Sequence, residues 1–131
     1  LIIKILQDAS YDNCLALDSH KLGEEEIKVI VNGKNQITEL SKTCSIEKAI
    51  GESIGIEKIS HTYLLALHEE LEHMILHEKL DNVFYELAFE RLIARGQYFY
   101  PVDTSAYFSM ELDTPEDFHD AINRIPKHLQ A

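Results

Sequence analysis

The chain has few basic residues for its length. Among its 131 residues, 12 are lysine or arginine and 23 are aspartate or glutamate, which gives a formal net charge of -11 at pH 7. A surface that binds duplex nucleic acid needs clustered lysine and arginine to contact the phosphates. We therefore expect no nucleic-acid partner. Carboxylates in this number suit divalent cations, or serve solubility alone.

Sequence signals of several other protein classes are missing as well. No apolar run is long enough to span a membrane, and no signal-peptide pattern is present. The two cysteines, Cys14 and Cys44, lack the spacing of a metal site. We interpret them as reduced thiols of a cytoplasmic protein, and Cys44 is a poor candidate nucleophile because no histidine partner is evident. There is no G-x-G-x-x-G loop and no P-loop lysine.

What is present is an alternation of strand and helix patterns without repeats or linkers. Apolar or β-branched runs predict strands, and Asn32-Gly33 predicts a hairpin between two of them. The predicted strands cover residues 13–18, 25–32, 36–40, 49–60, 97–103 and 106–113. Helical periodicity predicts helices over residues 1–9, 60–80, 82–96 and 114–125. This order predicts one α/β domain, with a mixed sheet flanked by helices.

Local signals mark several element boundaries. Ser60 and Asp81 are predicted to cap the second and third helices, and Gly96 to end the third. Thr114 is predicted to cap the last helix, with proline at its first position. Two glycines in the run "AIGESIGIEKIS" predict a strand that is bent or closely approached by other backbone.

The histidines of the second predicted helix first suggest a metal site. The segment "HEELEH" resembles H-E-x-x-H, but its second histidine lies five residues on, so the two rings do not share a helix face. His73 and His77 are four residues apart and could bind zinc together with Glu69. A solvated polar helix face is the alternative interpretation.

Asp113 lies at the end of the last predicted strand. Ligands bind at the carboxyl ends of strands in open α/β sheets. Thr114 and the acidic residues after it already supply a complete helix start. Asp113 is therefore not needed as a cap, and binding of a metal ion is one role open to it.

Four stretches, in chain order, resemble the second half of the MobA-like nucleotidyltransferases. They are "KVIVNGKNQITELSK", "AIGESIGIEKIS", "NVFYELAFERLIARG", and "FYPVD" followed by "FSMELDTPEDFHDA". This family consists of small Rossmann-like enzymes that join a nucleoside monophosphate to a phosphorylated sugar, alcohol or amine. The branch with this closing motif includes phosphocholine, inositol-phosphate and aminoethylphosphonate cytidylyltransferases.

The resemblance implies a Mg²⁺-dependent transfer of a nucleoside monophosphate, which we expect to be CMP. An acceptor oxygen attacks the α-phosphate of an NTP, and pyrophosphate leaves. Asp113 matches a metal-binding aspartate of the family, and Lys42 a catalytic lysine that steadies a phosphate. Glu52 and Glu86 match acidic positions near the acceptor pocket that would suit a cationic head group. Lys58 is placed with them among the substrate-binding residues.

The resemblance covers only the acceptor side of the family's fold. The nucleotide-binding loop and the first metal-binding aspartate of the family lie in an N-terminal half that this sequence lacks, and position 87 is leucine where the family often has aspartate. Residues 1–131 are thus expected to form the C-terminal, acceptor-side part of a Rossmann-like sheet. We expect a homodimer, or association with the missing half, to cover the unpaired edge. The alternative is a non-catalytic α/β interaction module.

Overall fold

A computed structural model describes residues 1–20 and 23–130 of the chain. Strands and helices alternate along it, as the sequence predicts. The elements are α1 (Ile2–Asp8), β1 (Cys14–Asp18), β2 (Lys28–Val31), β3 (Ile37–Ser41), β4 (Gly51–Lys58), α2 (His61–Glu72), the π-helix η1 (His73–His77), α3 (Glu86–Ala94), β5 (Tyr100–Asp103), α4 (Pro115–Arg124) and the 3₁₀ helix η2 (Lys127–Leu129). No helix among these residues has both the length and the apolar content that a membrane crossing requires.

The strands form one mixed sheet. Its order is β3-β2-β4-β1-β5, and five strands take part. β1 and β5 run parallel, whereas β1–β4, β2–β3 and β2–β4 are antiparallel. The predicted α/β class with a mixed sheet and flanking helices is therefore confirmed.

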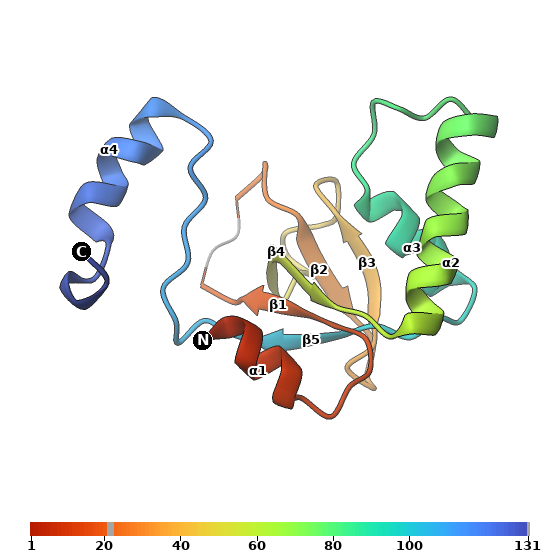
Figure 1. Ribbon diagram of the computed structural model, residues 1–131, viewed down its shortest axis with the longest axis horizontal. Helices are drawn as coiled ribbons and strands as arrows, with labels where there is room; N and C mark the ends of the chain where they lie inside the picture. The colour runs from red at the N-terminus through yellow and green to blue at the C-terminus, as the bar shows by residue number, and fades with distance from the viewer. Residues whose placement is uncertain (21–22, 131) are drawn as a thin grey trace.

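Helices cover the sheet on both faces, whereas α4 stands apart from it (Figure 1). α2, η1 and α3 pack on one face, over a core that includes Leu15, Leu17 and Phe99. α1 packs on the other, where Leu6 meets Cys14 and Ala16 of β1. All five residues of β1 are buried, because alternate side chains of this strand enter the two cores.

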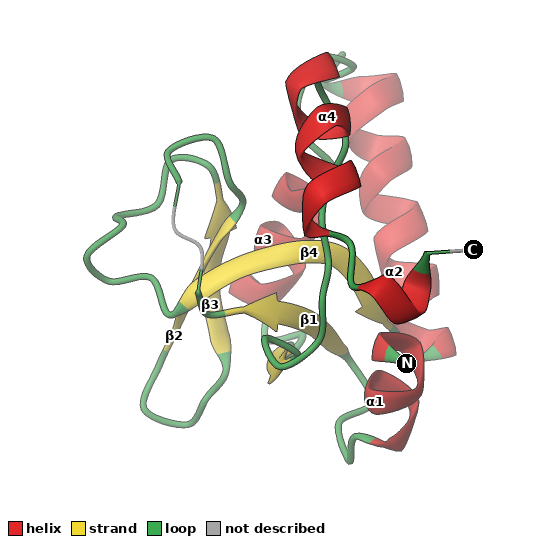
Figure 2. Cartoon of the chain, turned by 90° about the vertical axis from the view of Figure 1, so that its left-hand side faces the viewer, coloured by secondary structure: helices red, strands yellow, loops and turns green. Residues whose placement is uncertain are grey.

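β4 is the long, curved strand that crosses the middle of the sheet in Figure 2. Its pairing with β1 is irregular, with Leu15 opposite Glu57 but Leu17 opposite Ser53. Gly55 lies inside this irregularity with a φ of +74°, a conformation that side chains other than glycine adopt poorly. At Gly51 a Cβ atom would lie 2.5 Å from the carbonyl oxygen of Asp18. The predicted bend and close approach are both confirmed.

The β2–β3 hairpin is confirmed, although its turn differs from the predicted one. Asn35, with a φ of +59°, takes the left-handed position. The Asn32 side-chain oxygen accepts hydrogen bonds from the backbone N–H groups of Lys34 and Gln36, at 2.9 and 3.0 Å. Asparagine therefore supplies the turn geometry at both of these positions.

Most predicted helix boundaries are confirmed. The Ser60 hydroxyl accepts a hydrogen bond from the Tyr63 N–H at 3.2 Å. Gly96 ends the third helix with a φ of +88°. Thr114 and Asp117 form a reciprocal capping box at the start of α4.

Two predictions are wrong. Residues 106–113 form turns and irregular chain instead of a strand, because the sheet ends at β5 and the described residues offer this segment no neighbouring strand. Asp81 does not cap α3, which begins at Glu86 after an irregular segment. Asp113 consequently lies at the end of a loop, directly before the cap of α4.

Candidate functional site

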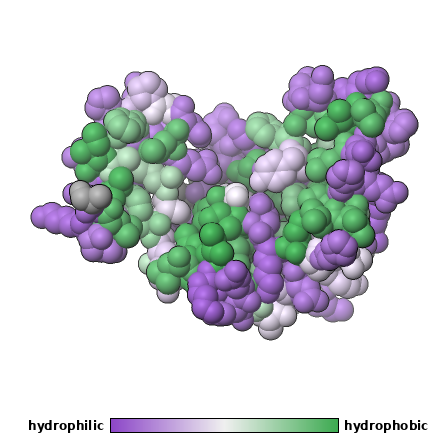
Figure 3. All heavy atoms as spheres, in the orientation of Figure 1, coloured by the Kyte–Doolittle hydropathy of each residue, from purple (hydrophilic) through white to green (hydrophobic). Residues whose placement is uncertain are grey.

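The largest concentration of predicted site residues lies in one pocket of about 570 Å³. Lys42, Glu86 and Asp113 all line it, although they are far apart in the sequence. Lys42 follows β3, Glu86 begins α3, and Asp113 precedes α4. Figure 3 shows the molecule hollowed between the α4 side and the rest of the chain. The fold thus brings three distant elements to one cavity.

Lys42 is held at the pocket by two neighbours. Its Nζ atom lies 3.6 Å from a carboxylate oxygen of Glu25 and 4.4 Å from the centre of the Phe84 ring. A cation over an aromatic face is attracted by the ring's negative surface. The ammonium therefore has a defined position, and its side chain keeps 33% of its surface exposed to a ligand.

Glu86 is buried in the first turn of α3, with 8% of its surface exposed. Its Oε2 atom has no hydrogen-bond partner among the described residues. A buried carboxylate oxygen without a donor is costly. Its position at a pocket wall would let a ligand supply that donor.

Tyr85 and Phe84 place aromatic rings beside Glu86 at the pocket wall. The Tyr85 hydroxyl donates a hydrogen bond to Glu57 at 3.3 Å. Burial raises the pKa of Tyr85, and the negative charges of Glu57 and Glu86 raise it further. Burial also raises the pKa of Glu57. An acidic wall with two aromatic rings is chemically suited to an ammonium group.

Asp113 is exposed at the pocket mouth. Its backbone N–H donates to Asp117 at 3.2 Å, while Thr114 and Asp117 make the cap of α4. The prediction that the Asp113 side chain is not required for the cap is confirmed. This carboxylate can therefore serve a ligand without disrupting the helix start.

Glu52 and Lys58 lie elsewhere on β4. Glu52 is buried, with 6% exposed, and lines a smaller pocket of about 270 Å³. That pocket shares Glu26 and Glu111 with the larger one, so the two cavities adjoin. Lys58 instead donates hydrogen bonds to backbone carbonyls near the end of α1, at 2.9 and 3.4 Å. Lys58 therefore joins β4 to the end of α1 and lines neither pocket.

Lys28 is a positioning residue that the sequence reasoning missed. It is 2% exposed, and its ammonium donates to the carbonyl oxygens of Gly23, Glu24 and Glu26 at 3.0 to 3.3 Å. These contacts fix the loop that carries the pocket residues Glu25 and Glu26. A lysine inside a strand pattern gave no signal of this role.

The pocket is strongly acidic. Six carboxylate side chains and one ammonium line it, the acids being Glu25, Glu26, Glu86, Glu111, Asp113 and Asp117. Such a surface favours a cationic group and opposes an anion unless a cation accompanies it. Within residues 1–20 and 23–130, no group of three or more His, Cys, Asp or Glu side chains is arranged to hold a metal ion.

The histidines of α2 and η1 form no such group. The rings of His73 and His77 have centroids 5.4 Å apart, and His73 lies 3.9 Å from Glu78. Cys44 is buried, and burial raises the pKa of its thiol. Neither feature lies at the acidic pocket.

Comparison with known proteins gives this site no family. No protein-family model matches the chain. No curated protein matches it significantly. The pocket must therefore be interpreted from its own chemistry and from the motif resemblance.

Proposed function

We propose that the chain is the acceptor-side part of a nucleotidyltransferase, similar to cytidylyltransferases, that acts on phosphorylated or phosphonylated small molecules. The observation that supports this is the meeting of Lys42, Glu86 and Asp113 at one pocket. These are three of the positions at which the motif resemblance expects substrate or metal contacts. In the reaction, an acceptor oxygen forms a bond to the α-phosphorus of the NTP. The bond to the bridging oxygen breaks, and pyrophosphate leaves.

Each of the three residues has a role that suits its environment. The ammonium of Lys42 is a point charge for the acceptor's phosphate, held by Glu25 and Phe84. Glu86, beside Tyr85, would accept a hydrogen bond from a cationic head group or balance its charge. Together they would place the two ends of a zwitterionic acceptor such as a phosphorylated amine.

Asp113 could supply one ligand of a Mg²⁺ site but cannot form the whole site by itself. Magnesium prefers oxygen ligands, and it commonly takes one or two carboxylates together with waters and substrate phosphates. One exposed carboxylate at the mouth of the pocket meets that need. Bound there, Mg²⁺ would neutralise phosphate charge, which an acidic pocket with one lysine cannot do alone. The free thiols of Cys14 and Cys44 fit a cytoplasmic enzyme.

A non-catalytic interaction module is the second candidate. The exposure of Asp113 and the engagement of Lys42 by Glu25 favour it, because both residues are satisfied without a nucleotide. In that case the acidic pocket binds a cationic ligand or a basic peptide, and no transfer follows.

Pyrophosphate release separates the two candidates. The assay would use a longer natural protein containing this chain, with Mg²⁺, a panel of NTPs and phosphorylated acceptors. We expect release that depends on one acceptor and falls about 100-fold or more in Asp113→Asn, the size of effect seen when a transition-state charge contact is lost.

The matched control is Asp120→Asn, which changes an exposed aspartate of α4 outside the pocket. Release that survives Asp113→Asn would remove the proposed role of Asp113, and absence of release would favour the module. The 131-residue chain alone is expected to show no turnover.

A further inference from the structure

The outer face of α2 and η1 carries an apolar surface that the core does not use. Inner residues of this helical segment, among them Tyr63, Leu67 and Met74, are buried. The outer face nevertheless exposes four large apolar side chains: Leu64 at 48%, Leu65 at 58%, Ile75 at 49% and Leu76 at 59%. A surface helix of a monomer usually has one apolar stripe. A second stripe on the opposite side indicates a second partner.

The residues of this outer face are arranged as a palindrome in the sequence. Two leucines, Leu64 and Leu65, lie at one end, and Ile75 and Leu76 lie at the other. His68 and Glu72 lie between them, each at the same distance from residue 70. At 3.6 residues per turn, Leu64, Leu65, His68 and Glu72 fall on one side of α2. Ile75 and Leu76 lie in the π-helix η1 and line the same groove as His68 and Glu72. A pattern that is the same when read in reverse is matched by an antiparallel copy of itself.

A shallow groove runs across the same face. It encloses about 320 Å³ and is lined by His68, Leu71, Glu72, Ile75 and Leu76. Side chains of a facing helix can enter such a groove, as in ridge-and-groove packing. The groove covers the half of the pattern that ends in Ile75 and Leu76. In two copies related by a two-fold axis, the groove of each copy would therefore face Leu64 and Leu65 of the other.

We propose that this face binds the same face of a second copy of the chain, with the two α2 helices antiparallel. The two-fold axis passes near residue 70. Leu65 of one copy then faces Ile75 of its partner, and Leu64 faces Leu76. His68 faces Glu72 across the axis, twice. Within one chain these two side chains already lie 3.9 Å apart, so the contact would gather two imidazoles and two carboxylates at its centre.

The polar pair is the reason for choosing a second copy as the occupant. An unrelated apolar partner would cover His68 and Glu72, whose side chains are 71% and 60% exposed, without offering either of them a second group of opposite charge. A second copy matches both at once, because a two-fold interface is self-complementary. This inference is independent of the proposed enzymatic function, since the outer face of α2 contributes no residue to the acidic pocket.

Sedimentation velocity over a concentration series tests the proposal directly. The wild-type chain is expected to change from one to two chain masses as concentration rises. Leu65→Glu and Ile75→Lys should each weaken dimerisation about tenfold or more, since each places a charge against an apolar partner. Leu112→Glu, a leucine with similar exposure (55%) outside this face, should leave the association unchanged. Circular dichroism would verify that each variant is folded.

A charge-pair experiment tests the antiparallel register. Mixing the Leu65→Glu chain with the Ile75→Lys chain should restore a dimer, because the new carboxylate faces the new ammonium of the partner. A wild-type chain that stays one chain mass at every concentration would overturn the proposal. So would two single variants that associate no better mixed than apart. Loss of the dimer in Ile122→Glu but not in Leu65→Glu would also overturn it, because the contact would then belong to the exposed apolar face of α4.

Discussion

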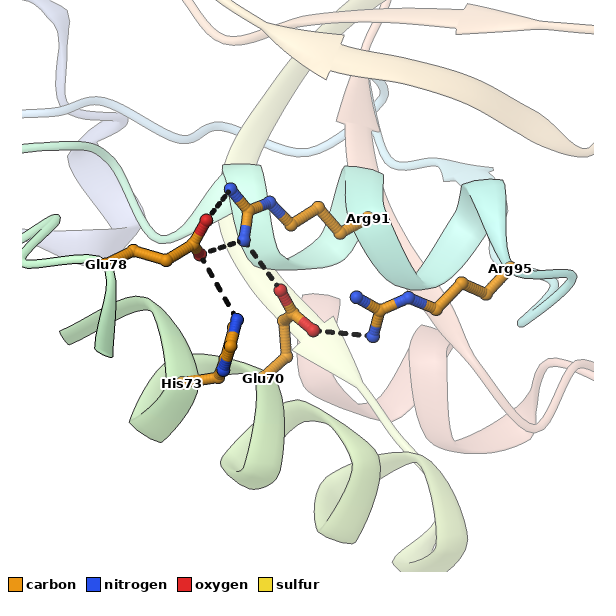
Figure 4. Close-up of polar contacts among 5 residues, drawn as sticks. All are labelled: Glu70, His73, Glu78, Arg91 and Arg95. Atoms are coloured by element: carbon orange, nitrogen blue, oxygen red, sulfur yellow. Dashed lines mark hydrogen bonds and ion pairs between the residues drawn. The ribbon is translucent and has the colours of Figure 1, made fainter. Parts of the chain in front are cut away.

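Two buried glutamates on neighbouring helices have opposite environments. Glu70 of α2 is 4% exposed, and Glu86 of α3 is 8% exposed. Glu70 accepts hydrogen bonds from Arg91 at 2.9 Å and from Arg95 at 2.5 Å, and Figure 4 shows both guanidinium groups directed at it. Glu86 has one carboxylate oxygen without a hydrogen-bond partner among the described residues.

The contrast separates a structural acid from a candidate binding acid. The Glu70 cluster joins α2 to α3, and Arg91 also binds Glu78, which lies 3.9 Å from His73. Every charged group in that cluster has a partner of opposite charge. Glu86 instead lies at the wall of the acidic pocket, where a ligand can complete its hydrogen bonding. We expect the first glutamate to matter for stability and the second for binding.

The largest expected effect is the loss of stability in Glu70→Gln. A neutral amide cannot replace the two charge-assisted hydrogen bonds, and it leaves two arginines without their shared acceptor. Because Arg91 and Arg95 keep 28% and 59% of their side-chain surface exposed, they can turn to solvent. The cost should therefore lie below that of a fully buried broken pair, at about 2 kcal/mol. Urea denaturation with an unchanged slope would measure it.

Glu69→Gln is the matched control for this experiment. Glu69 is the exposed neighbour of Glu70 on the same helix, so its replacement should change the free energy of unfolding by less than about 0.5 kcal/mol. Equal effects of the two substitutions would contradict the structural role of Glu70.

The same cluster predicts how stability depends on acid. Burial raises the pKa of Glu70, but the hydrogen bonds and positive charges of Arg91 and Arg95 together lower it by more, so its pKa lies below the ordinary value of 4.5. The unfolded chain then takes up this proton at a higher pH than the folded chain does. The contribution of Glu70 is therefore complete above about pH 5 and is lost as the pH falls through the lowered pKa.

Comparing wild type with Glu70→Gln between pH 7 and pH 3 isolates this contribution. Their difference in unfolding free energy should shrink on acidification. Glu57 and Glu90 have pKa values raised by burial, so their contributions have the opposite sign and decline as the pH rises. They are present in both proteins and cancel in the comparison. A difference that stays constant with pH would show that the charge of Glu70 is not what stabilises the fold.

The sequence predicted those features that depend on local chemistry. Thr114 and the residues after it specify a helix start within one turn, and the capping box forms as expected. The buried β1 run is equally local, because its first four residues are apolar on both faces. Residues 106–113 have a strand pattern as well, but a strand also needs a neighbour to pair with, and the described chain supplies none there.

The candidate site was predictable only in part for the same reason. Lys42, Glu86 and Asp113 came from motif resemblance, and their meeting at one pocket could not be derived from spacing. The ring of Phe84 under Lys42 was missed because it depends on tertiary packing. The adjacent aromatic and acidic residues of the segment "VFYE" could have indicated an aromatic pocket wall.

The smallest expected effect on stability is that of Glu86→Gln, and it is the sharpest test of the contrast. Removing a buried charge that lacks a complete set of partners should leave the free energy of unfolding within about 0.5 kcal/mol of wild type, or raise it slightly.

Ligand binding should respond differently to the Glu86→Gln substitution. Calorimetric titration with phosphocholine, and with choline alone, should show weaker binding to Glu86→Gln than to wild type, by about tenfold if the carboxylate meets the ammonium group. Glu47→Gln, at an exposed position outside the pocket, should bind as wild type does. If Glu86→Gln instead destabilised the protein as much as Glu70→Gln and left binding intact, both glutamates would be structural, and the pocket would lose its candidate contact for a cation.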